Sequence, residues 1–168
     1  MPASAPFHQR FVELFDAQFP RLFRYLDRLS GEPDLAADVA QDTFVRLYRR
    51  GEMPHTPQAW LITVAMNLFR NAKSTRRRRL RLLTPSRGEH AHSEPPPAPD
   101  DAVVQDEARG RVRRAIDRLP ERERHLLLLQ AEGYSYRDIA RALALNEASV
   151  GTLLARARRQ FRDGYDDA

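Results

Sequence analysis

The chain has no cysteine among its 168 residues, which excludes disulfides, thiolate metal sites and cysteine nucleophiles. It has no apolar run near the roughly 18 residues that a membrane-spanning helix requires. Its first residues, MPASAPFHQR, lack the apolar centre of a signal peptide. Strand-like alternation of apolar and polar residues is missing too. From these absences we expect an all-α protein located in the cytoplasm.

Residues arranged for catalysis are equally scarce. The sequence has no recognisable Ser/His/Asp set, no phosphate-binding glycine loop and no paired catalytic carboxylates. His90 and His92 form an H-x-H pair, but no other suitable metal ligand stands near them. We therefore expect neither enzymatic activity nor a bound metal or cofactor.

Charged residues are plentiful and unevenly distributed. Residues 1–84 hold 14 basic and 8 acidic residues, residues 85–108 hold 1 and 6, and residues 109–168 hold 13 and 9. Two basic blocks thus flank an acidic spacer, although the net charge of the whole chain is only +5. Basic blocks of this kind favour a polyanion partner, most commonly nucleic acid, over a merely solvated arginine-rich surface.

Apolar residues recur at helical spacing through residues 1–84, which we expect to form one small helical domain. The pattern predicts a first helix that Pro20 breaks or restarts and that Gly31 ends. A second helix is predicted from Pro33 to Gly51, and a third from Pro57. The inward faces are predicted to carry Leu35, Val39, Phe44 and Leu47 in the second helix and Trp60, Leu61, Val64 and Leu68 in the third.

Residues 85–101, PSRGEHAHSEPPPAPDD, contain five of the 12 prolines and no apolar periodicity. We expect a flexible linker there, followed by a second domain of four helices over 102–168. Ser135 and Asn146 are expected to cap the third and fourth of these helices. The first of the four is predicted to bury the stripe Val104, Ala108, Val112, Ile116 and Leu119.

The last two predicted helices have the spacing of a helix-turn-helix. A short helix over 135–143 is followed by the turn Ala144-Leu145-Asn146 and by a longer helix to about Arg162. An alanine in that turn costs about 1 kcal/mol if it adopts the left-handed conformation. The pattern is typical of DNA-binding domains, although a plain helical hairpin has the same spacing. The longer helix is predicted to bury Val150, Leu154, Ala157 and Phe161.

Several stretches together resemble one family, the bacterial sigma factors, and in particular their compact extracytoplasmic-function (ECF) group. GYSYRDIARALALNEASVGTLLARARRQFR resembles the family's promoter-binding C-terminal domain, and LPERERHLLLLQAEGYSYRDIA resembles the start of that domain. DLAADVAQDTFVRLYRR resembles the polymerase-binding helix, and TPQAWLITVAMNLFRNAKSTRRRR the promoter-melting helix. The resemblance implies a dissociable subunit whose partners are core RNA polymerase, promoter DNA and, as for many relatives, an anti-sigma factor.

The resemblance places the polymerase contact on one face of the predicted second helix. Amide and carboxylate side chains on that face can pair with arginines of a partner helix, while an aliphatic side chain packs between them. Without the resemblance, the same stripe would be an ordinary solvated face. The expected polymerase-binding residues are Asp38, Gln41, Asp42, Val45, Arg46 and Arg49.

The resemblance assigns the minus-ten promoter element to the predicted third helix and to the loop before it. Arginines there can neutralise phosphates, and shorter polar groups can reach base edges. Met53 and His55 in the loop are suited to stack on an extruded base, with an ordinary loop as the alternative. Trp60 is expected in the core, and Met66 on the outward stripe. The expected minus-ten residues are Met53, His55, Thr63, Asn67, Arg70, Asn71, Ser74, Arg77 and Arg78.

The last predicted helix lacks the cationic side chains with which relatives read the minus-thirty-five element. Gly151, Leu153 and Ala155 stand where the family commonly has lysine, arginine and histidine. Small residues permit a close approach to DNA, and Ser149 and Thr152 can bond phosphates or base edges. We expect sparse reading, partly through DNA shape. The expected minus-thirty-five residues are Arg141, Ser149, Gly151, Thr152, Ala155, Arg156 and Arg159.

The sequence thus predicts a two-domain, all-α sigma factor that acts by binding. The alternative is a free-standing helix-turn-helix regulator that uses only residues 109–162, which leaves the melting-type helix without a role. One observation separates the two, because only a sigma factor binds core polymerase in the absence of DNA.

Overall fold

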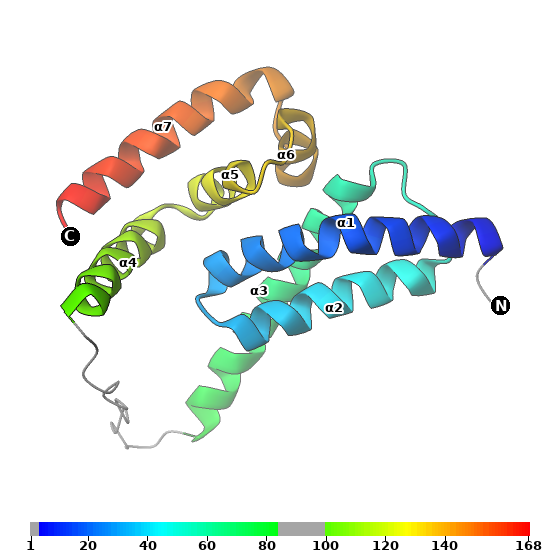
Figure 1. Cartoon of the computed structure of the whole chain (residues 1–168), viewed down its shortest axis with the longest axis horizontal. Coiled ribbons are helices and arrows are strands. Elements are labelled where there is room, and N and C mark those ends of the chain that lie inside the picture. The colour runs from blue at the N-terminus through cyan, green and yellow to red at the C-terminus, as the bar shows by residue number, and fades with distance from the viewer. Residues whose placement is uncertain (1–3, 84–99) are drawn as a thin grey trace.

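The computed structural model describes residues 4–83 and 100–168, and within both ranges all regular structure is α-helical (Figure 1). The predicted linker, with His90 and His92, lies outside these ranges except at residues 100 and 101, which begin a helix. The all-α class is confirmed. The N-terminal half contains α1 (Ala5–Ser30), α2 (Pro33–Arg50) and α3 (Pro57–Leu83), and the C-terminal half contains α4 (Asp100–Arg118), α5 (Glu121–Ala131), α6 (Tyr136–Leu143) and α7 (Glu147–Asp166).

Aromatic side chains join α1 to α2. The ring centroids of Phe15 and Phe44 lie 5.0 Å apart with the rings edge to face, and those of Phe11 and Tyr48 lie 5.3 Å apart in the same arrangement. Such pairs contribute about 0.5–1.5 kcal/mol beyond the burial of their area. The α1–α2 pair is therefore a firm platform against which α3 packs (Figure 1).

Pro20 does not break the first helix, so that prediction was wrong. α1 is continuous from Ala5 to Ser30 with Pro20 inside it. Both Pro20 and Asp16, whose carbonyl loses its amide partner, belong to the exposed side of the helix, where water can replace the missing hydrogen bond. Phe19 and Leu22 pack into the core on either side of the proline and hold the two segments in line.

Met66 faces the interior, which corrects its predicted outward position. Its side chain is only 5% exposed, and Ile62 one turn earlier is fully buried. Trp60 and Leu68, by contrast, are only half-buried. Met66 is buried because α3 packs against α2 on one side and against α6 on another. A helix with two partners buries a wider stripe than the pattern of a single face predicts.

The predicted caps of the C-terminal half are confirmed. The amide of Asp138 donates to the Ser135 hydroxyl at 3.1 Å, and the amide of Ala148 donates to the Asn146 side chain at 3.1 Å. Ala144 has a φ of 55° and a ψ of 46°, so the turn between α6 and α7 does contain a left-handed alanine.

The apolar stripe of α4 is buried only near its C-terminal end. Ala115 and Leu119 are buried, whereas Val104 is 65% and Val112 39% exposed. Ala108 is exposed as well, so the prediction of a buried stripe was wrong for the first half of this helix. The reason is that α4 packs mainly on α7, which reaches only the later turns of α4.

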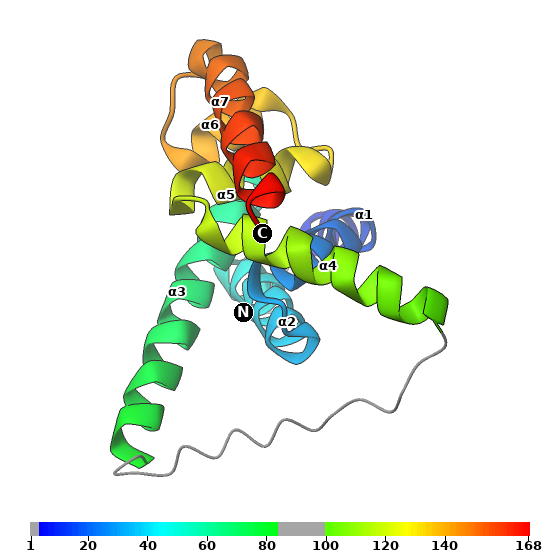
Figure 2. The same cartoon turned by 90° about the vertical axis from the view of Figure 1, so that its left-hand side faces the viewer.

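The two halves of the chain are packed against each other, a point that the sequence left open. α1 contacts α5, and α3 contacts α6. Arg113 of α4 donates to the backbone carbonyls of Arg28 and Leu29 at the end of α1, the latter at 2.9 Å. Figure 2 shows the last turns of α3 projecting beyond this contact. The structure is therefore a closed arrangement of the two halves.

Candidate functional site

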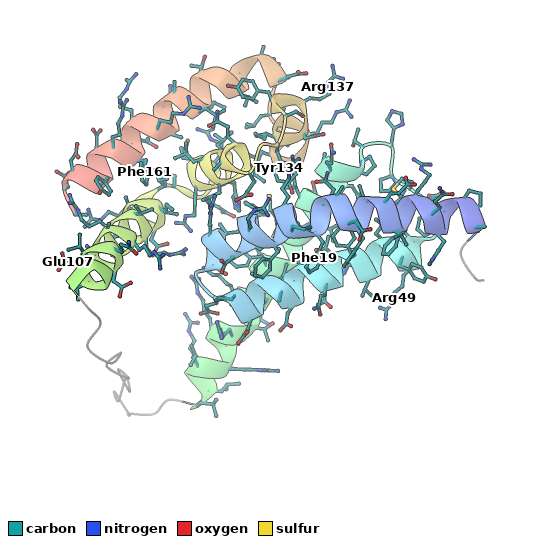
Figure 3. All side chains as sticks on the ribbon, viewed as in Figure 1. Phe19, Arg49, Glu107, Tyr134, Arg137 and Phe161 are labelled. Atoms are coloured by element: carbon teal, nitrogen blue, oxygen red, sulfur yellow. The ribbon has the colours of Figure 1, made fainter. Side chains whose placement is uncertain are left out.

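The predicted polymerase-binding residues form an exposed face on α2. All six side chains are exposed, and Val45, at 44%, is an apolar group surrounded by polar ones. Arg49 extends from the side of α2 that is remote from the C-terminal half (Figure 3). Because α2 packs only against α1 and α3 among its main contacts, this face is accessible in the closed arrangement.

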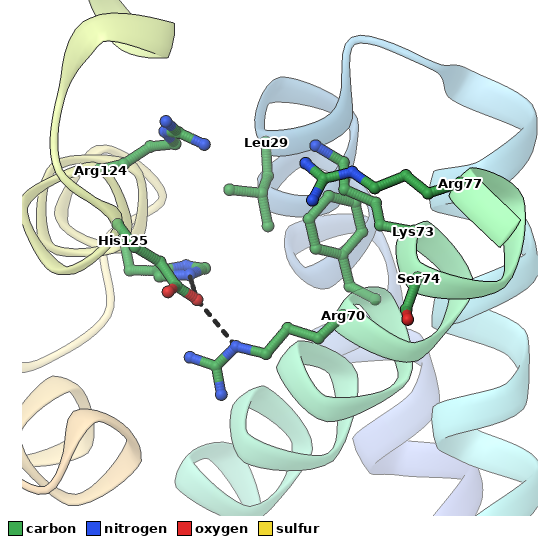
Figure 4. A pocket seen from close by; sticks show the side chains of 9 residues that line it. Leu29, Arg70, Lys73, Ser74, Arg77, Arg124 and His125 are labelled. Carbon is green, nitrogen blue, oxygen red and sulfur yellow. Dashed lines mark hydrogen bonds and ion pairs between the residues drawn. The ribbon is translucent and has the colours of Figure 1, made fainter. Parts of the chain in front are cut away.

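The predicted minus-ten residues of α3 lie along its exposed side, but several are engaged within the chain. The Thr63 hydroxyl donates to a carbonyl of its own helix at 2.9 Å. Arg70 forms an ion pair with Glu121 of α5 at 2.7 Å. Ser74 and Arg77 line a pocket that α5 shares (Figure 4). The remaining members, Asn67, Asn71 and Arg78, are exposed.

The loop before α3 presents one exposed and one half-buried side chain from the predicted pair. His55 is exposed, whereas Met53 is half-buried. Trp60, in the first turn of α3, packs at the edge of the core, with the guanidinium of Arg50 6.0 Å from the centre of its ring. A role for Trp60 in packing is consistent with this position.

The predicted minus-thirty-five face of α7 is open to solvent. Ser149, Thr152 and Ala155 are exposed, and the helix begins with a capped N-terminus whose unpaired amides favour anions. Gly151 is half-buried beside the ring of Tyr136. Three arginines at the flanks, Arg141, Arg156 and Arg159, are exposed and have no ion-pair partner among the described residues.

Ion pairs hold the closed arrangement at its rim. The carboxylate of Glu132, whose side chain is 5% exposed, pairs with Arg24 at 2.9 Å and with Arg28 at 2.8 Å. The guanidinium of Arg21 lies 4.9 Å from the ring centre of Tyr134, which is buried. These arginines all belong to α1, so one side of α1 is committed to the C-terminal half.

A buried hydrogen bond lies at the centre of the junction. The Tyr25 hydroxyl of α1 is 2.5 Å from Nδ1 of His125 on α5, and both side chains are buried. Burial raises the pKa of Tyr25 far above its ordinary value, so the hydroxyl stays protonated and donates. Burial also lowers the pKa of His125 from 6.5 to about 4. The imidazole is therefore neutral near pH 7 and accepts this bond at Nδ1.

Sequence reasoning missed the residues of this junction. Tyr25 stands on the apolar stripe of α1 and His125 directly before a run of four leucines. A polar side chain in a buried register needs a partner, so each position carried a signal. No pattern in the sequence shows, however, that the two residues are partners of each other.

Two absences concern the described ranges alone. No helix there combines the length and the apolar character needed to cross a bilayer. The same ranges contain no group of three or more His, Asp or Glu side chains placed to hold a metal ion.

Comparison with known proteins identifies the class. Residues 14–79 match the family model for Sigma-70 region 2, and residues 109–161 match that for Sigma-70, region 4. The chain is 33% identical over 148 residues to the ECF RNA polymerase sigma factor EcfG of Rhodopseudomonas palustris, covering 85% of this chain and 76% of EcfG. The chain therefore belongs to the ECF family of RNA polymerase sigma factors.

Other relatives show the same pattern. The ECF RNA polymerase sigma factor SigE of Mycolicibacterium smegmatis is 31% identical over 156 residues, which are 90% of this chain. The chain spans only 60% of the length of SigE. The solved sigma factor RpoE, in complex with the anti-sigma factor NepR from Bartonella quintana, has the same fold with a TM-score of 0.66 at 24% identity, covering 94% of this chain and 98% of RpoE. CnrH, solved in complex with the cytosolic domain of CnrY, is similar with a TM-score of 0.64 at 21% identity, covering 95% of this chain and 90% of CnrH.

Proposed function

We propose that this chain binds core RNA polymerase, directs it to one class of promoter and helps to open the DNA for initiation. It acts in the cytoplasm by binding alone, and polymerase performs the nucleotidyl transfer. The observation that carries this proposal is that α2, α3 and α7 each have an exposed face. These faces lie within the stretches that match Sigma-70 region 2 and region 4, and the relatives of the chain are RNA polymerase sigma factors.

In this proposal, residues 1–84 form the polymerase- and minus-ten-binding domain and residues 102–168 the minus-thirty-five-binding domain, joined by residues 85–101. The carboxylates and amide on α2 pair with cations of a polymerase helix around Val45. The arginines of α3 and α7 hold phosphates, while the small side chains of α7 let that helix approach the bases closely.

The closed arrangement limits how much DNA the chain holds on its own. Arg70, a proposed minus-ten contact, is paired with Glu121, and α6 covers part of α3. Binding at both promoter elements therefore requires the halves to separate. RpoE was solved with an anti-sigma factor, and we propose a protein of this kind as a further partner of this chain.

Co-purification with core polymerase in the absence of DNA tests the proposal. We expect the wild-type chain to bind, and the double variant Asp38→Ala, Asp42→Ala to bind at least about tenfold more weakly because it loses two charge-assisted contacts. The matched control is Asp106→Ala, Glu107→Ala, which removes two exposed carboxylates of α4. No binding by the wild type, or equal loss in both variants, would refute the polymerase assignment.

Transcription from a genomic promoter library with the same polymerase then tests the DNA assignments. Activity on one promoter class is the expected result. A chain that binds its DNA fully without polymerase and leaves the duplex closed would instead be a free-standing regulator.

A further inference from the structure

A basic pocket of about 380 Å³ lies between the two halves of the chain (Figure 4). α3 forms one wall and α5 the other, while Leu29 and Phe69 supply its apolar part. The volume falls within the range of about 300–1,000 Å³ that is usual for small-molecule sites. The polar side chains that matter to the argument are Arg70, Lys73, Ser74, Arg77, Glu121 and Arg124.

The positive charge in this pocket is not balanced. Glu121 is its one carboxylate, and Arg70 already pairs with it at 2.7 Å. Within the described part of the chain, the side chain of Arg77 has neither an ion pair nor a hydrogen bond, and the partner of the Lys73 ammonium is the Phe69 ring, whose centre is 4.9 Å away. Crowding of cations is also visible in Lys73, whose pKa is lowered by burial and then by Arg124 and other nearby arginines. Asp117 opposes this shift, but its carboxylate is paired with Arg113 at 3.0 Å.

The geometry suits a ligand that reaches both walls. Figure 4 shows Lys73 and Arg77 on the α3 wall, with the Arg77 guanidinium turned toward Arg124 on the α5 wall. Arg124 is fixed in place, because it donates to three backbone carbonyls at the end of α4, the closest at 2.9 Å. Arginine forks and the Ser74 hydroxyl are donors that fit phosphate oxygens.

We propose that this pocket binds a small molecule with two or more adjacent phosphates, such as a nucleoside di- or triphosphate. A chain of phosphates spans from Lys73 and Arg77 to Arg124 and neutralises cations that have no carboxylate partner. Since it contacts both halves, the bound ligand stabilises the closed arrangement. It also occupies Ser74 and Arg77, so it competes with minus-ten DNA, a consequence that rests on the proposed function, whereas the binding itself does not.

Titration calorimetry of the full chain with inorganic triphosphate, at 0.15 M salt, tests the binding. We expect saturable binding of one triphosphate per chain and a rise in melting temperature. The double variant Lys73→Gln, Arg77→Gln changes two side chains at the surface of α3 and should bind at least about tenfold more weakly. The matched control is Arg79→Gln, Arg81→Gln, which removes two exposed charges of the same helix outside the pocket and should bind within about twofold of the wild type.

Two further measurements distinguish binding in the pocket from a general attraction to polyanions. Glu121→Gln should bind triphosphate more tightly, because it removes the one carboxylate and releases Arg70. A DNA oligonucleotide should lose affinity in both double variants, because DNA covers a longer part of α3 than the pocket does. No saturable triphosphate binding, or equal losses in the pocket and control variants, would overturn the proposal. Polymerase co-purification is measured separately, so either result can fail while the other stands.

Discussion

Acidification should open the closed arrangement through His125. The pKa of this imidazole is about 4 in the closed chain, below the ordinary 6.5, because burial disfavours the cation. Opening removes α1 and its Tyr25 hydroxyl from the ring, so the pKa returns toward 6.5. Protons therefore bind preferentially to the open form. The stability of the closed form is fully present above pH 6.5 and is lost progressively as the pH falls to 4.

The magnitude follows from these two pKa values. Between pH 7 and pH 5 the closed form loses about 1.8 kcal/mol relative to the open form, which is about a twentyfold change in their ratio. Other groups face His125, namely Tyr25 from α1, Arg70 from α3, and Glu121 and Arg124 on α5. Glu121 stays ionised in this range, because its hydrogen bond with Arg70 lowers its pKa. The imidazole is thus the group of this cluster that titrates.

Energy transfer between two introduced dye sites measures the opening. The chain has no cysteine, so Asp16→Cys on α1 and Gln160→Cys on α7, both at exposed positions, can be labelled selectively. We expect transfer to fall between pH 7 and pH 5 in this background and to remain constant when His125→Gln is added, because the amide accepts a hydrogen bond but does not titrate. An identical pH profile with His125→Gln would refute the assignment to His125.

Three other perturbations have defined outcomes. Glu132→Gln should weaken the closed form by about 1 kcal/mol, because two half-exposed arginines lose their shared carboxylate; small-angle scattering would then report a larger radius of gyration, and an unchanged radius would show that these pairs are dispensable. Ala144→Gly should stabilise the C-terminal half by up to about 1 kcal/mol, because the residue has a φ of 55°; a lower melting temperature would contradict this account of the turn. Arg156→Gln with Arg159→Gln should reduce the salt dependence of DNA affinity by about 0.9 per lost phosphate contact; an unchanged slope in a salt titration would remove these arginines from the interface.

Elements that depend on local chemistry were predictable from the sequence. Both ends of α2, the start of α3 at Pro57 and the caps at Ser135 and Asn146 match the structure, because each depends on a few adjacent residues. The predicted break at Pro20 was wrong, because the effect of a proline on a helix depends on what packs on either side of it. Sequence alone shows the proline but not the aromatic platform that keeps α1 continuous.

The three candidate faces could be predicted, whereas the junction could not. An exposed stripe on one helix follows from periodicity. The α2 residues are all exposed as that reasoning requires, and so are the α7 residues except the half-buried Gly151. Met66, Tyr25 and His125 became buried because a second domain covers them. Contacts between residues a hundred positions apart leave no periodic pattern in either segment. The basic pocket could not be predicted for the same reason, because its walls come from both halves of the chain.

The position of α2 sets an order for assembly. Its outer face lies away from the C-terminal half (Figure 1), so under the proposed function polymerase can bind this face while the two halves are still packed together. In that scheme polymerase binding precedes exposure of the proposed minus-ten residues of α3, and the two halves separate only after the chain has joined the enzyme.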